Sequence, residues 1–269
     1  MRGASRASYA SLREALAAVA VGPATSEQIG DQLFAVVRLL DSEHGLRRAL
    51  ADASKPSQEK AGVTRRLLHG RVSEATEGLV ADAAAAHWAT SGDFADALEQ
   101  LAIEALTMAA QYGGTLDDLE DDLFRFGRVV TGQPALRSAL IGSTGPDAKG
   151  SLLADLLSAK VSGPSLSLIT QVLTHPRGRS PQAVLDLAAS IAARRREQLI
   201  AVVRVATELS AAQRQRLLTA LTATYGQGIH LNVVHDPAVV GGVSVQIGDE
   251  LIDGTAASRL AEVRRRLAG

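Results

Sequence analysis

The stretch VVGGVSVQIGDELIDG, residues 239–254, has the pattern of a β-hairpin and decides how the C-terminal part of the chain folds. Val243, Val245 and Ile247 alternate with polar residues, which places them on one face of a strand. The dipeptide Gly248-Asp249 offers a two-residue turn, and the preceding Gly-Gly pair permits a positive φ or a close backbone approach. None of these residues is a nucleophile, so the stretch indicates a structural unit rather than a catalytic one.

The segments that flank the hairpin follow a defined order. A hydrophobic strand over residues 201–206 leads into a helix after Ser210, and a second strand ends at residues 234–237. In this order, residues 196–269 resemble the delta subunit family of bacterial ATP synthases, which includes the mitochondrial oligomycin-sensitivity-conferring protein. A typical member of that family has one helical domain followed by one small C-terminal domain.

The pattern over residues 196–269 is β-α-β-β-α. Ser210, with a glutamine three residues later, has the signature of a capping box at the start of the first helix. The last helix is expected to bury Leu260, Val263 and Leu267, with three arginines near its negative end. We therefore predict a small α/β domain at the C-terminus.

The composition favours a predominantly α-helical protein. Hydrophobic residues make up 46% of the chain but aromatic residues only 3%, which suits helices that pack through alanine and leucine. A net charge of -1 argues against a nucleic-acid partner, and the absence of cysteine excludes disulfides and thiolate metal sites. No segment approaches the roughly 18 uninterrupted apolar residues of a transmembrane helix, so we expect no direct membrane span.

Residues 1–112 and 113–195 resemble each other at an offset of about 90 residues. The segments 31–34 (DQLF) and 46–50 (LRRAL) align with 121–124 (DDLF) and 136–140 (LRSAL). Ordered matches at a nearly constant offset favour a duplication, although Ala- and Leu-rich helices can also resemble each other by chance. The predicted fold is α+β and predominantly α-helical, with two helical-bundle repeats followed by the small β-α-β-β-α domain.

Motifs that could carry chemistry are weak. The acidic run 117–122 could hold a metal ion, but a helix start favours carboxylates by roughly 0.3 to 1 kcal/mol each, so we expect a solvated helix start. The six histidines form neither an H-x-x-x-H pair nor a cluster. The basic loop 176–180 could bind an anionic lipid or phosphate, but an exposed turn between helices is the simpler expectation. We predict no catalytic, cofactor-binding or metal site.

The family resemblance implies a function. It implies a non-catalytic peripheral-stalk (stator) subunit of a proton-translocating rotary ATP synthase, located at the cytoplasmic face of the bacterial cell membrane. In the family, the helical domain binds the N-terminal segments of the alpha subunits and the C-terminal region engages the b stalk. By this resemblance, the candidate partner-binding residues are Tyr9, Ala10, Leu12 and Leu16 in the first helix and Leu260, Val263 and Leu267 in the last.

Some alternatives stay open. Leu12 and Leu16 could equally be core residues, and the arginines before residues 15–24 mimic a signal peptide, although the helical spacing favours an amphipathic helix of the mature chain. The extra helical copy departs from the family pattern and leaves open which copy contacts the alpha subunits. The alternative function is a cytoplasmic helical adaptor or ligand-binding regulator.

Overall fold

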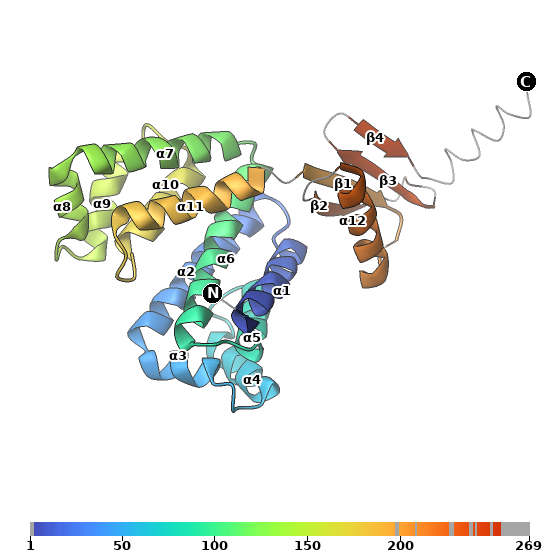
Figure 1. Ribbon diagram of the computed structural model, residues 1–269, viewed down its shortest axis with the longest axis horizontal. Helices are drawn as coiled ribbons and strands as arrows, with labels where there is room; N and C mark the ends of the chain where they lie inside the picture. Colours follow the sequence, from blue (N-terminus) through green and yellow to red (C-terminus); the bar gives the residue numbers. More distant parts are fainter. Residues whose placement is uncertain are drawn as a thin grey trace, which may run out of the picture. The chain divides into compact units, whose positions relative to one another are not determined.

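The computed structural model describes residues 3–196, 199–207, 209–225, 229–236, 239, 241–247 and 250–253. The chain divides into two compact units, Met1–Arg195 and Arg196–Gly269. Helices α1 to α11 build the first unit, and the described part of the second unit contains a small sheet and the helix α12 (Figure 1). A predominantly helical chain with a small α/β part is therefore confirmed.

Short connections join the helices of the first unit. Their bounds are α1 (Ala4–Val19), α2 (Pro23–Ser42), α3 (His44–Ala51), α4 (Ser57–Leu68), α5 (Glu74–Ala85), α6 (Ser91–Tyr112), α7 (Leu116–Gly132), α8 (Pro134–Ile141), α9 (Pro146–Leu157), α10 (Gly163–Thr174) and α11 (Pro181–Arg196). Proline lies in the first turn of α2, α8, α9 and α10, where its fixed φ suits a helix and no intrahelical N–H bond is lost.

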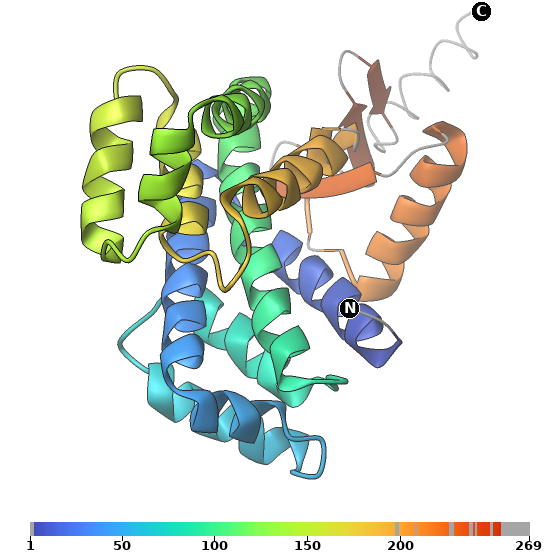
Figure 2. The same cartoon turned by 60° about the vertical axis from the view of Figure 1, so that its left-hand side comes forward.

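Helix α6 is the central element of the first unit. Nearly every side chain between Phe94 and Ala110 is buried, including the carboxylates Glu99 and Glu104. A helix of this kind must be covered on all sides, and α1, α2 and α10 all pack against it. Helix α2 runs beside α6 (Figure 2) and approaches so closely that a Cβ at Gly30 would lie 2.8 Å from the side chain of Leu106.

Two consecutive series of helices match in order, and the three middle helices of each series match in length. We call α2 to α6 the first series and α7 to α11 the second. Helices α3 and α8 have 8 residues each, and α4, α9, α5 and α10 have 12 each. The Ser73 hydroxyl caps the start of α5, and the Ser162 hydroxyl caps the start of α10 in the same way. The predicted boundary at 112/113 falls at the end of α6, inside the first compact unit.

The second unit contains a four-stranded sheet. Its elements are β1 (Leu199–Val205), α12 (Ala211–Tyr225), β2 (Ile229–His235), β3 (Val243–Ile247) and β4 (Glu250–Asp253). The strand order is β2-β1-β3-β4, with β1 parallel to β2 and the other pairs antiparallel. The predicted order β-α-β-β-α was one strand short, because the second arm of the hairpin is itself a paired strand.

Local details of the second unit agree with the sequence. Ser210 N donates to Gln213 Oε1 at 2.8 Å, and Gln213 N donates to Ser210 Oγ at 3.3 Å, which confirms the capping box. Val245 and Ile247 are buried and Val243 is partly buried against the same core, as the alternation predicts. The predicted last helix, with Leu260, Val263 and Leu267, lies outside the described residues.

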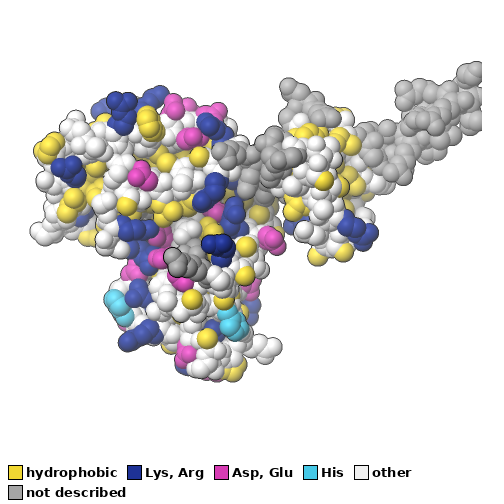
Figure 3. Space-filling view, viewed as in Figure 1, with side chains coloured by type: hydrophobic (Ala, Val, Ile, Leu, Met, Phe, Trp, Pro, Cys, Tyr) yellow, Lys and Arg dark blue, Asp and Glu magenta, His cyan; other side chains and the backbone are white. Residues whose placement is uncertain are grey.

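Hydrophobic side chains reach the surface of the first unit at several points between charged residues (Figure 3). The large exposed ones in this unit are Val21, Phe124, Val129, Ile141 and Leu156. Four of these five belong to the second series. Within the described ranges, no helix has the length and apolar character needed to cross a membrane.

Candidate partner-binding surfaces

The residues of α1 that were predicted to bind a partner lie in different environments. Leu12 is 4% exposed and Leu16 is 0% exposed, and both belong to the hydrophobic core of the first unit. Tyr9 is half-buried, whereas Ala10 is exposed. In this conformation, α1 therefore presents Ala10 and its exposed neighbours to solvent, while the two leucines fix the helix to the rest of the unit.

Tyr9 takes part in a buried polar cluster with α6. Its hydroxyl donates to Glu104 Oε1 at 2.8 Å, and Arg13 Nε donates to Glu104 Oε2 at 2.9 Å. Burial, and then the charge of Glu104, raise the pKa of the Tyr9 hydroxyl well above its ordinary value, so that it remains a donor. These charge-assisted hydrogen bonds tie α1 to α6. Sequence reasoning did not find Glu104, because its partners Tyr9 and Arg13 lie about 90 residues away and leave no local signal.

The loop between α10 and α11 forms a network of ion pairs with the first series. Arg177 Nε donates to Asp41 Oδ2 at 2.7 Å, and its Nη1 lies 2.6 Å from Asp96 Oδ1 and 3.0 Å from Glu99 Oε2. Arg179 Nη2 also donates to Glu99 Oε1. The Arg177 side chain is only 12% exposed, so the expectation of an exposed turn was wrong for this residue. Three carboxylates from α2 and α6, distant in sequence, hold it in place.

The conformation and charge of Arg177 fit this role. Its φ is 52°, in the left-handed region that residues other than glycine rarely adopt, and Gly178 follows with a φ of 77°. Burial alone would lower the pKa of the Arg177 guanidinium, but the charges of Glu99, Asp41 and Asp96 raise it above its ordinary value. Arg177 is therefore a permanent cation that fastens the second series to the first.

Helix α10 makes further polar contacts with α2. Ser167 Oγ donates to Asp31 Oδ1 at 3.2 Å, and Arg38 Nη1 donates to Gln171 Oε1 at 2.7 Å. Phe34 lies on the same stripe of α2, between these two contacts, and is 5% exposed. This stripe of α2 is therefore covered from within the chain.

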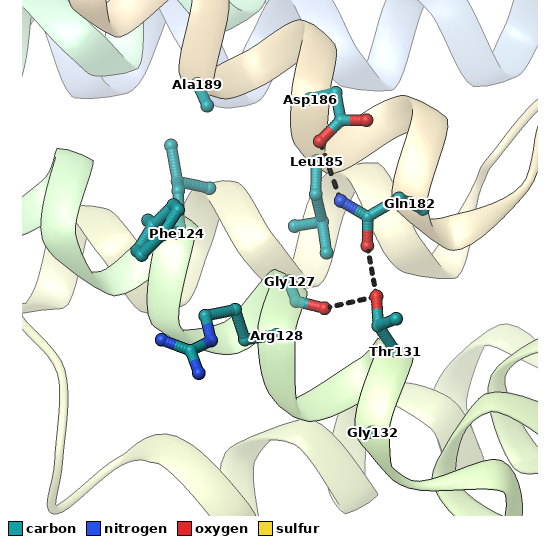
Figure 4. Close-up of a pocket in the computed structure, with 10 residues that line it drawn as sticks. Phe124, Gly127, Arg128, Thr131, Gly132, Gln182, Leu185, Asp186 and Ala189 are labelled. Atoms are coloured by element: carbon teal, nitrogen blue, oxygen red, sulfur yellow. Dashed lines mark hydrogen bonds between the residues drawn. The ribbon is translucent and has the colours of Figure 1, made fainter.

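An open groove of about 340 Å³ lies between α7 and α11. Phe124 and Arg128 project from α7, and Leu185 and Ala189 line the opposite wall (Figure 4). At one end, the Thr131 hydroxyl lies 2.8 Å from Gln182 Oε1, and Gln182 Nε2 donates to Asp186 Oδ1 at 2.7 Å. Phe124 is 65% exposed. The groove therefore has an apolar floor and a polar rim, as protein docking surfaces do.

A second hollow of about 540 Å³ lies among α7, α8 and α9. Its lining is mostly apolar and includes Val129 and Leu156, which are 41% and 36% exposed. Both hollows belong to the second series.

The acidic run 117–122 lies at the start of α7, as expected. Asp117 and Asp118 occupy its first turn, and Asp121 pairs with Arg125 one turn later at 3.0 Å. Asp122 is buried and accepts a bond from Ser162 N at 3.4 Å. Within the described residues, no three His, Asp or Glu side chains come together to hold a metal ion.

A helical unit with buried ion pairs and open apolar grooves is typical of a protein that works by binding other proteins. Comparison with known families makes this class specific. The family described as ATP synthase delta (OSCP) subunit matches residues 103–267. The match begins inside α6 and continues through the second series and the sheet.

Individual relatives match the whole chain. An ATP synthase subunit delta from Streptomyces griseus is 45% identical over 271 residues, and one from Thermobifida fusca is 45% identical over 270, each match covering 100% of both chains. One from Kineococcus radiotolerans is 44% identical and covers 99% of this chain and 98% of its own. A chain of the Toxoplasma gondii mitochondrial ATP synthase hexamer matches 62% of this chain and 95% of its own at 16% identity, with a TM-score of 0.28, which carries no structural argument.

The chain belongs to the ATP synthase delta (OSCP) subunit family, the family of a peripheral-stalk subunit of ATP synthase. Membership supports the stator prediction over the adaptor or regulator alternative. The full-length relatives also align with the residues that precede residue 103, where the family match begins.

Proposed function

We propose that the chain is a non-catalytic stator subunit that links the catalytic head of a proton-translocating ATP synthase to its peripheral stalk and resists torque during ATP synthesis. The observation that carries this proposal is the match over the full length of both chains to subunits of that name. The buried ion pairs between the two helical series suit a mechanical role, because they hold separate helices in one compact unit.

The proposed partners are the N-terminal segments of the alpha subunits and the b stalk, at the cytoplasmic face of the membrane. For the alpha contact, α1 offers Ala10 and its exposed neighbours, because Leu12 and Leu16 are in the core. For the stalk contact, Leu260, Val263 and Leu267 stay candidates from the sequence alone.

We also propose that the two helical series are a duplication, with residues 1–112 as the first copy and 113–195 as the second. Three observations support it: the equal lengths of three pairs of corresponding helices, the matching serine caps, and the start of the family match at residue 103. Helix α6 would then end the first copy and pack against α7 and α10 of the second. The extra copy would stiffen or lengthen the strut, or give it a second docking surface.

Native mass spectrometry tests the stator assignment. The chain is tagged in its host, membranes are solubilised gently, and the complexes that remain bound are weighed. We expect recovery with the alpha, beta and b subunits at one copy per head. A chain that is recovered with none of these subunits would contradict the proposal.

A coupling measurement tests the strut. Deletion of residues 1–112 would also remove α6, which the second series needs as part of its core, so a point variant is the sharper probe. Arg177→Met should loosen the two series and lower ATP-driven proton pumping relative to ATP hydrolysis, while Arg125→Met, which breaks an exposed pair, should not. Unchanged coupling in an assembled Arg177→Met enzyme would contradict the stiffening role.

A further inference from the structure

A stripe of α2 and a stripe of α7 carry the same residue types at the same spacing. On α2 the stripe is Asp31, Phe34, Arg38 and Asp41, and on α7, about 90 residues later, it is Asp121, Phe124, Arg128 and Thr131. Steps of three and four residues place each set on one face of its helix. Only the last position differs in chemistry.

The α2 stripe is occupied by the chain itself. Helix α10 packs on α6 and reaches Asp31 through Ser167 and Arg38 through Gln171. Beyond the end of α10, Arg177 reaches the last stripe position and Asp96 of α6. The bound segment therefore has three parts: a hydroxyl, an amide four residues later, and a cation six residues after the amide.

The α7 stripe is exposed. Phe124 is 65% exposed where Phe34 is 5% exposed, and the Asp121 side chain is 67% exposed. Helix α11 corresponds to α6, and its Asp186 is the counterpart of Asp96. Asp186 is exposed beside the groove that Phe124 lines. The second series therefore keeps four residues of the face that the first series presents, Asp121, Phe124, Arg128 and Asp186, but without a covering helix among the described residues.

The other faces of α2 and α7 are buried alike. Ile29 and Leu119, Leu33 and Leu123, Val36 and Phe126, and Leu40 and Val130 are corresponding pairs, and all eight are buried. The buried faces of the two helices therefore correspond residue by residue. They differ in their surroundings: α2 packs closely along α6 and its stripe is reached by α10, whereas a groove separates α7 from α11.

We propose that the α7 stripe and the groove beside α11 dock an amphipathic helix of another polypeptide, lying parallel to α7. The contacts of α10 with α2 define the residues that this helix carries. A Ser or Thr contacts Asp121, and an Asn or Gln four residues later contacts Arg128. A basic residue six positions after the amide contacts Asp186. The proposal deepens the stator function and rests on it, since it names the kind of partner that the second series binds.

The charged residues of the two series indicate how many basic residues the partner helix needs. In the first series, three carboxylates hold two arginines, Arg177 and Arg179. In the second series, Thr131 replaces Asp41 and Ala189 replaces Glu99, so Asp186 is the one counterpart that keeps its charge. The partner helix therefore needs one basic residue at this place rather than two.

A second copy of this chain does not fit as the occupant. Its own α10 already lies on its own α2 stripe, with Arg177 buried in the ion-pair network. Releasing that helix would leave Glu99, which is 3% exposed, without its cations. A helix from a different polypeptide requires no such rearrangement.

Photo-cross-linking in the intact complex tests the proposal. A photoreactive benzophenone amino acid replaces Phe124 in one variant and Ile141, which is 62% exposed and does not line the groove, in a control. We expect position 124 to cross-link to a helix of another subunit with the hydroxyl, amide and basic spacing given above. Asp186→Arg should lower that yield at least tenfold, and Asp155→Arg, the same charge change elsewhere on the second series, should leave it unchanged.

Four outcomes would overturn the proposal. The first is that position 124 gives no cross-link in the assembled enzyme, and the second is that it cross-links to a second copy or to the same chain. The third is a cross-linked segment that lacks the basic residue. The fourth is a cross-linking yield that Asp186→Arg does not change. Failure of the stator function is a different result, because the chain would then not be recovered with the ATP synthase at all.

Discussion

The α2 face of the first series and the α7 face of the second are alike in sequence but opposite in exposure. Phe34 and Phe124 each follow the same Asp-x-Leu motif, yet one is 5% and the other 65% exposed. The cause is the neighbours and not the residue, since α6 packs closely along α2 and α10 and Arg177 reach its stripe, whereas a groove separates α7 from α11. An amphipathic stripe is therefore core or interface according to what lies on it.

The largest expected effect separates the two phenylalanines. Phe34→Ala should lower the free energy of unfolding by about 3 to 5 kcal/mol, because it leaves a cavity in a packed core. Phe124→Ala should change it by no more than about 0.5 kcal/mol in the isolated chain. Urea titration of both variants measures the difference. Equal losses would mean that the two faces are not opposite in exposure.

The ion-pair network should give the next largest effect. Arg177→Met should cost about 3 kcal/mol, because it strands Glu99 and its neighbours with only Arg179 as a cation. Arg125→Met breaks the exposed pair with Asp121 and should cost less than about 1 kcal/mol. The measurement is the urea midpoint of each variant. The fastening role of Arg177 is wrong if both arginines prove equally dispensable.

The serine caps of α5 and α10 should contribute equally to the free energy of unfolding, because the two series correspond there. Ser73→Ala and Ser162→Ala each remove a side-chain acceptor from a helix start, and each should cost about 1 kcal/mol. Thermal unfolding of the two variants provides the comparison. A large loss in only one of them would weaken the correspondence between α5 and α10.

The smallest effect concerns pH. Burial, and then the charge of Arg38, lower the pKa of His175 below its ordinary value of about 6.5, despite the opposing charges of Asp41 and Asp147. The folded chain prefers the neutral ring, so this stabilisation is full above about pH 6.5 and is lost as the pH falls below it. His175→Gln should flatten the decline of the urea midpoint between about pH 7 and pH 5. Parallel declines in both proteins would exclude His175 as a source.

Local signals predicted much of the fold. Alternation of Val243, Val245 and Ile247 predicted β3, and the Ser210 capping box predicted the start of α12. The repeat offset of about 90 residues aligned segments 31–34 and 121–124 before any side chain was placed. These features depend on neighbours in sequence, which is why they were accessible.

The contacts between the two series could not be predicted in the same way. Arg177 meets carboxylates on α2 and α6 that lie far from it in sequence, so its loop had the composition of an exposed turn. Phe34 and Phe124 share their local sequence, and the helices packed around them make the difference. Tertiary contacts of this kind have no short-range signal.

The central claim is that a partner helix covers the α7 stripe in the assembled enzyme. Because the chain has no cysteine, Phe124→Cys gives a single thiol whose rate of maleimide labelling reports its exposure. We predict rapid labelling in the isolated chain and at least tenfold slower labelling in intact ATP synthase, with little change at Ile141→Cys. Equal labelling rates of Phe124→Cys in the two states would contradict the claim.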